Sequence, residues 1–127
     1  MLKETITYKN FNDVEVTETF LFNLTQAEVL EMEQVYPGGY AGFLQSIIDS
    51  KDQPALVKIF KDFVLKCYGE KSADGRNFMK EDEDGRPLYR KNFIFTQAYS
   101  KLYMRLATDD EYASKFVKGV LPENMDI

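Results

Sequence analysis

The residues whose types could support chemistry are concentrated between Leu65 and Lys91, in the stretch LKCYGEKSADGRNFMKEDEDGRPLYRK. The stretch contains a cysteine, a GEKS sequence similar to part of a phosphate-binding loop, and four consecutive acidic residues. A phosphate loop holds its ligand with backbone amides and needs a glycine-rich turn of the form GxxxxGK[ST] between a strand and a helix. GEKS lacks that glycine spacing, and Glu70 would repel a phosphate. The sequence therefore does not predict a nucleotide site.

Calcium binding is the second chemistry that this stretch could support. An EF-hand loop starting at Glu70 would place Ser72, Asp74 and Glu81 at the third, fifth and twelfth positions, with Gly75 at the sixth. Against this interpretation, the first position is Glu instead of Asp, and no clear helix follows the loop. The alternative is a hairpin turn at Asp74-Gly75, a pair that favours type I′ geometry. We prefer the turn, and we keep a calcium or hydrolytic site using Glu70, Asp74 and Glu81 as the weaker hypothesis.

Catalysis is not predicted from the remaining reactive groups. Histidine is absent, which removes the commonest general base and the commonest transition-metal ligand. Cys67 falls on an apolar helical stripe, where a thiol usually behaves as a small core residue. The acidic run from Glu81 to Asp84 is typical of a solvated loop, since nothing nearby would separate the pKa values of two carboxyl groups. We expect no enzyme activity, no catalytic residue, no cofactor and no metal.

Composition predicts one globular domain in a reducing compartment. The chain has 127 residues, of which 44% are hydrophobic and 29% charged, and a single cysteine. No apolar run is long enough to cross a bilayer, and the N-terminus lacks the apolar segment of a secretory signal. We therefore expect a cytoplasmic protein without a membrane partner.

Charge is unevenly distributed along the chain. The net charge is −5; residues 1–52 contain three basic and nine acidic side chains, and residues 53–127 contain 13 basic and 12 acidic ones. Neither part forms the basic field that binding to a phosphate backbone requires. Nucleic acid is therefore not an expected partner.

The elements that must position these residues belong to an α+β, mostly α fold, with an N-terminal β-hairpin followed by about five helices in a single compact domain. Alternation over residues 1–23 places Ile6 and Tyr8 on one face of a first strand. It places Val14, Val16, Phe20 and Phe22 on one face of a second. The segment KNFND between them predicts the hairpin loop. Residues 24–122 form the helical part, with a polar connector at about 69–92, and residues 123–127 form a short tail.

Capping residues predict where the helices begin. Thr25 and Glu28 form a capping box before a helix over about 26–35, and Thr108 and Glu111 form a second box. A short second helix is expected over 40–50. Asp52 precedes a third helix, which has a wide apolar stripe, and a fourth helix begins near Thr96.

Glycines predict two of the helix ends. Gly69 is expected to end the third helix in the left-handed conformation, and Gly119 is expected to end the last one.

Aromatic residues are more abundant than one small core obviously needs. The chain has 10 Phe and 8 Tyr, and no Trp. Such rings provide large contact areas at protein interfaces, and a Tyr hydroxyl tolerates a wet rim. The alternative is that the same stripe belongs to the core. The predicted partner-binding residues are Tyr36, Tyr40, Phe93, Phe95, Tyr99 and Tyr103.

Several segments together resemble a known family. These are FNLTQAEVLEMEQ, VKIFKDFVLKCYGEKSADGRNFMK, FTQAYSKLYMRLATDDEYASKFVKGVLP and the opening hairpin. They are similar to the tail assembly chaperones of long-tailed phages (siphophages) and of prophages of Gram-positive bacteria. The resemblance covers residues 5–122, and YGEKSADGRNF is its most specific part. In one departure, DEDGRPLYRKNFIF is longer than the linker that the family pattern implies before TQAYS.

The resemblance implies a non-enzymatic chaperone in the host cytoplasm that is absent from the mature virion. Its expected partner is the tape-measure protein, a very long helical chain kept soluble until tail-tube subunits polymerise around it. The tail-tube protein and a longer, frameshifted form of the chain are further candidate partners, and a homo-oligomer is expected. The alternative is a structural virion protein, such as a head–tail connector or a tube-end protein.

Overall fold

The computed structural model describes residues 1–36 and 39–122, and its first element is the predicted β-hairpin. Strand β1 (Leu2–Lys9) pairs along its whole length with the antiparallel strand β2 (Glu15–Phe22). The register sets Tyr8 opposite Val16, which confirms the predicted faces of the paired residues. Val14, predicted on the same face, precedes β2 and is 53% exposed. In the loop, the Asn10 Oδ1 atom accepts hydrogen bonds from the backbone amides of Asn12 and Val14, at 2.9 and 3.1 Å. A local polar contact thus fixes the reversal of the chain.

Helices make up most of the rest of the described chain. Three predicted starts are confirmed by side-chain caps: Thr25 and Glu28 form the reciprocal capping box, the Asp52 carboxylate accepts from the Ala55 amide, and the Thr96 hydroxyl accepts from the Tyr99 amide. The helices are α1 (Gln26–Glu33), α2 (Tyr40–Ser50), α3 (Gln53–Cys67), α4 (Leu88–Asn92), α5 (Gln97–Thr108) and α6 (Asp110–Val120).

The predicted start of the last helix is wrong by one residue. Thr108 is the final residue of α5, and its hydroxyl donates to the Met104 carbonyl at 2.7 Å. Asp109 caps α6 instead, because its Oδ1 atom accepts from the Tyr112 amide at 3.0 Å.

Both glycines that were expected to end helices have other roles. Gly69 lies in strand β3 (Tyr68–Lys71), where a Cβ atom would lie 2.9 Å from the Met79 carbonyl oxygen and 2.8 Å from Cζ of Phe78. Gly119 lies inside α6, where a Cβ atom would lie 2.8 Å from Cδ1 of Leu2. Each glycine therefore permits a close tertiary approach.

The connector is folded as a second hairpin. β3 pairs with the end of β2 and with β4 (Phe78–Met79), giving the antiparallel order β1-β2-β3-β4. The predicted hairpin is thus present, but its type I′ turn is not: Gly75 has a positive φ of 75°, whereas Asp74 does not. A second turn follows, with Gly85 at a φ of 77° and a bridge between Glu81 and Pro87.

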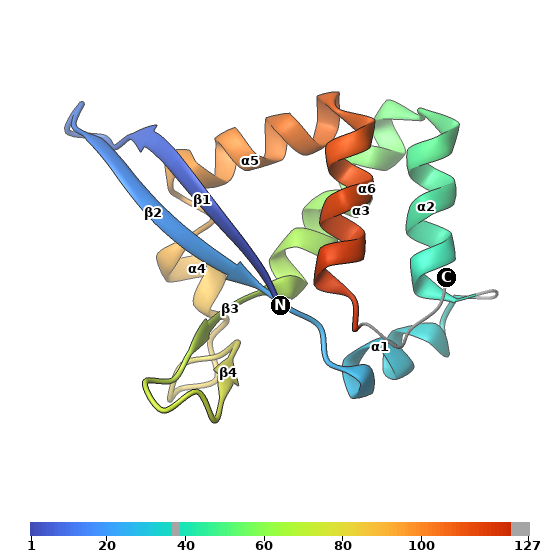
Figure 1. The fold of residues 1–127 in the computed structure, drawn as a ribbon, viewed down its shortest axis with the longest axis horizontal. Coiled ribbons are helices and arrows are strands. Elements are labelled where there is room, and N and C mark those ends of the chain that lie inside the picture. The colour runs from blue at the N-terminus through green and yellow to red at the C-terminus, as the bar shows by residue number, and fades with distance from the viewer. Residues whose placement is uncertain (37–38, 123–127) are drawn as a thin grey trace.

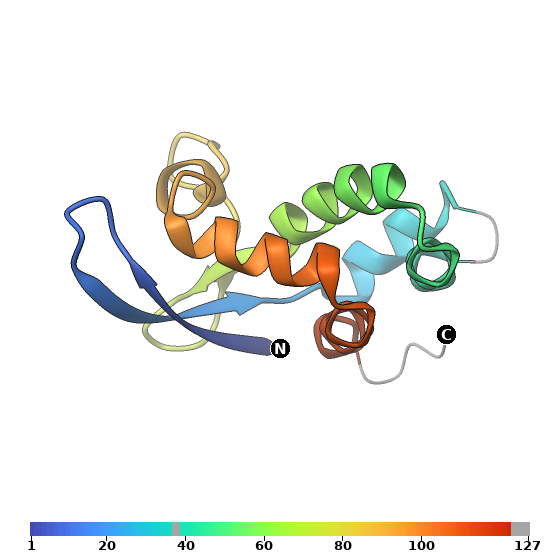
Figure 2. The same cartoon turned by 90° about the horizontal axis from the view of Figure 1, so that it is seen from above.

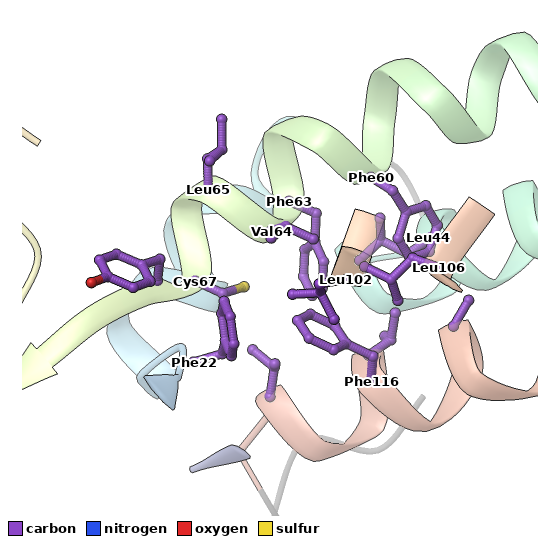
Figure 3. Packing of buried hydrophobic residues seen from close by; sticks show 14 of the residues in the cluster. Phe22, Leu44, Phe60, Phe63, Val64, Leu65, Cys67, Leu102, Leu106 and Phe116 are labelled. Carbon is purple, nitrogen blue, oxygen red and sulfur yellow. The ribbon is translucent and has the colours of Figure 1, made fainter. Parts of the chain in front are cut away.

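The helices pack beside the hairpin around one aromatic core. In Figure 1 the hairpin lies on one side of the molecule and α2 on the other, with α3 and α6 between them; Figure 2 shows the same arrangement from above. The ring of Phe22, from β2, has its centroid 5.2 Å from that of Phe116 in α6 and 5.6 Å from that of Phe93. Phe63, from α3, completes the contact with Phe116 at 6.1 Å (Figure 3). The core therefore joins strand β2 to helices α3 and α6.

Two further expectations concern the C-terminal tail and the membrane. The predicted tail at 123–127 lies outside the described residues. Within residues 1–36 and 39–122, no helix has the length and apolar character needed to cross a membrane.

Candidate partner-binding groove

The structure separates the six aromatic residues predicted to bind a partner. Phe93 is fully buried and stacks on Tyr68, with ring centroids 4.7 Å apart, and Tyr40 is only 3% exposed. Phe95 is 69% exposed, whereas Tyr36, Tyr99 and Tyr103 are half-buried. The list of residues that follows from pattern alone therefore mixes core and surface.

Five of these six aromatic residues form two groups, and Phe95 belongs to neither. Along α5, the ring centroids of Tyr99 and Tyr103 lie 5.7 Å apart, and buried Phe93 lies 5.3 Å from Tyr99. Tyr36, at the end of α1, contacts Tyr40 at 5.1 Å. In both groups a buried ring supports a half-exposed one.

A surface groove of about 530 Å³ lies where α1, the end of α3 and the connector meet. α1 and the connector both lie along the lower edge of Figure 1, below the other helices. The apolar part of the lining comes from all three elements. Its members are Met32, Val35, Tyr36, Leu65, Pro87 and Tyr89.

The groove exists because α1 buries little of its apolar surface. Val29 is its only fully buried residue, while Leu30 is 56% exposed and Val35, just beyond the helix, is 72% exposed. On α3, Leu65 lies outside the predicted core stripe, and its side chain points away from the cluster around Phe63 (Figure 3). The sequence analysis did not identify Leu65 as a groove residue. Its position outside the apolar stripe of the helix is a sequence signal that it packs elsewhere than in the central core.

An ion pair closes one part of the groove. The Lys80 ammonium group donates to Oε2 of Glu28 at 2.7 Å, and also to the backbone carbonyls of Asn23 and Lys66, at 2.8 and 2.7 Å. Burial alone would raise the pKa of the Glu28 carboxyl, but the hydrogen bonds from Lys80 and from the Thr25 amide outweigh it and lower that pKa. Lys80 therefore fastens the connector to α1 and α3.

Two reactive groups in or next to the connector, the Cys67 thiol at the end of α3 and the Asp82 carboxylate, have structural roles. Cys67 is fully buried, and burial raises the pKa of its thiol, which keeps it protonated. The Oδ1 atom of Asp82 accepts from the backbone amides of Asp84 and Arg86, both at 2.9 Å, so this carboxylate holds the second turn.

The connector does not bring the proposed calcium ligands together. Glu70 lies in β3. Its Oε2 atom accepts from the Tyr68 hydroxyl at 3.0 Å and from the side-chain amide (Nδ2) of Asn92 at 2.6 Å. Asp74 uses its Oδ1 atom in the turn, accepting from the Ser72 hydroxyl at 2.7 Å. Among the residues that the structure describes, no three acidic or thiol side chains gather as they would around a metal ion.

Comparison with known proteins gives one match. A family model described as phage tail assembly chaperone matches residues 1–126. Neither the curated proteins nor the solved structures include one that matches the chain.

Proposed function

Because the chain belongs to the phage tail assembly chaperone family, we propose that its groove binds the tape-measure protein and keeps that protein soluble. In this role the chaperone covers an apolar stripe of a long helical chain until the tail tube polymerises around it. The observation that carries the proposal is the meeting of apolar side chains from three elements in one groove, where Val35 is 72% exposed and Leu65 is 9% exposed, with the other apolar lining residues half-buried.

The groove suits a helical partner for physical reasons. An amphipathic helix binds by laying its apolar face into an apolar groove, with anchor residues spaced three and four apart. Met32 and Val35 come from α1 and the turn after it, Leu65 comes from α3, and the connector contributes Pro87 and Tyr89. A fully buried Val or Leu side chain stabilises a complex by about 1.5–3 kcal/mol, so a few such contacts can hold a helix.

The six predicted aromatic residues take different parts in this proposal. Tyr36 lines the groove and Tyr40 holds its ring in place from below. Tyr99 and Tyr103 form a second contact surface along α5, which Phe93 supports from the core. Phe95, 69% exposed just before that helix, offers a separate contact.

The wider role follows from the same proposal. The chain acts without enzyme activity in the host cytoplasm and is absent from the finished particle. It associates with further copies of itself along the partner, and the tail-tube protein and a frameshifted longer form are its other partners. Stoichiometric copies in purified particles would instead support the alternative of a connector or tube-end protein.

Co-expression tests the groove directly. Tape-measure fragments are produced with the wild-type chain, with Val35→Glu, or with the control Val14→Glu, which changes a 53% exposed valine in the hairpin loop outside the groove lining. We expect Val35→Glu to weaken the complex about tenfold and to lower the soluble, co-purified fraction, because a charge replaces an apolar contact. Val14→Glu should leave that fraction unchanged. Equal activity of both variants would contradict the proposal.

A further inference from the structure

The charged residues around the groove differ in whether they are available to a partner. Glu28 and Lys80 neutralise each other, and Lys80 also donates to two backbone carbonyls. The second oxygen of Glu28 accepts from the Thr25 amide at 3.0 Å. Both side chains are therefore occupied within the chain and add little net charge to the groove.

Three other charged side chains line the groove and are exposed: Glu31, Lys66 and Glu81. Within residues 1–36 and 39–122 the one ion pair is that of Lys80 and Glu28, so none of these three has a charged partner. Glu31 belongs to α1, Lys66 to the end of α3 and Glu81 to the connector, so the two acidic groups come from different elements. The three groups together carry one net negative charge.

We propose that the groove selects an amphipathic helix whose apolar stripe has Lys or Arg on both flanks. This inference rests on the proposed function and specifies the chemistry of the bound segment. A helix whose apolar stripe lies on this lining brings its flanking residues near the charged ones, where the long stems of Lys or Arg can follow the apolar lining and place their charges beside Glu31 and Glu81. Acidic flanking residues would meet like charge at these two glutamates.

The expected selectivity is modest because the charges are exposed. A single exposed ion pair changes an equilibrium constant by up to about fivefold. Replacing attraction by repulsion at both glutamates should therefore change the dissociation constant by about tenfold. Because such pairs are screened, the difference should shrink as the salt concentration rises.

Three synthetic helical peptides test the inference. They share one Leu stripe and carry Lys, Gln or Glu on both flanks, and fluorescence anisotropy gives their dissociation constants at low and high salt. The wild-type chain should bind the Lys peptide most tightly and the Glu peptide about tenfold more weakly. The double variant Glu31→Lys/Glu81→Lys should reverse this order, a gain that an unfolded variant could not produce.

A control separates the groove from the overall charge of the protein. Glu15→Lys/Asp49→Lys changes the net charge by the same amount at exposed positions outside the groove lining, and it should keep the wild-type order. Equal binding of the three peptides, or the same reversal in the control, would overturn the inference while leaving the groove as a helix site. Absence of binding by every peptide would overturn the proposed function as well.

Discussion

At the scale of single residues, Lys80 is the contact on which the connector depends. Lys80→Met would leave the carbonyls of Asn23 and Lys66 without their donor and would leave the Glu28 carboxylate unpaired. We expect the free energy of unfolding to fall by about 1–3 kcal/mol, as it does when partly buried polar groups lose their partners. Urea unfolding measures the change. Lys71→Met, at an exposed lysine of β3, is the control, and an equal loss in both variants would refute the role of Lys80.

Gly69 gives a second prediction at this scale. In Gly69→Ala the new methyl group would meet the Phe78 ring and the Met79 carbonyl, so β3 and β4 would have to separate. We expect a loss of about 1–3 kcal/mol in the free energy of unfolding. Gly42→Ala is the matched control, because nothing lies within 4 Å of its Cβ position and α2 should gain up to about 1 kcal/mol. A Gly69→Ala protein as stable as the wild type would show that the close approach is not needed.

At the scale of elements, the start of α6 tests which residue caps it. Asp109→Ala removes the carboxylate that accepts from the Tyr112 amide. We expect the free energy of unfolding to fall by about 1 kcal/mol, which should lower the melting temperature. Thr108→Ala removes only a hydroxyl that donates to its own helix, so its effect should be smaller. If Thr108→Ala is the more damaging change, the capping assignment is incorrect.

How much of each element could be predicted depends on whether its cause is local. The strands and the caps at Thr25, Asp52 and Thr96 follow from alternation and from hydrogen bonds within three residues, and the structure confirms them. Gly69 and Gly119 could not be placed, because each meets a side chain or carbonyl from a distant segment. α4 was not predicted because its five residues, LYRKN, are too few to show a helical period.

At the scale of the whole molecule, the groove could be predicted only in part. Periodicity identifies apolar positions, but it does not say which of them the packing leaves uncovered. Of the predicted partner-binding residues, Tyr36 is half-buried and lines the groove, whereas Phe93 and Tyr40 belong to the core. Leu65 and Val35 line the groove because α1, α3 and the connector meet there. Family membership, by contrast, follows from a pattern that covers residues 1–126.

Site-specific photo-crosslinking in phage-producing cells tests the central claim most directly. A photoreactive phenylalanine replaces Val35 in the groove or, in the control, Val14 in the hairpin loop. We predict that the Val35 position forms a covalent adduct with the tape-measure protein before tails assemble, and that the Val14 position forms much less. An equal yield of the adduct at the two positions, or no adduct from Val35, would contradict the claim that the groove covers this partner.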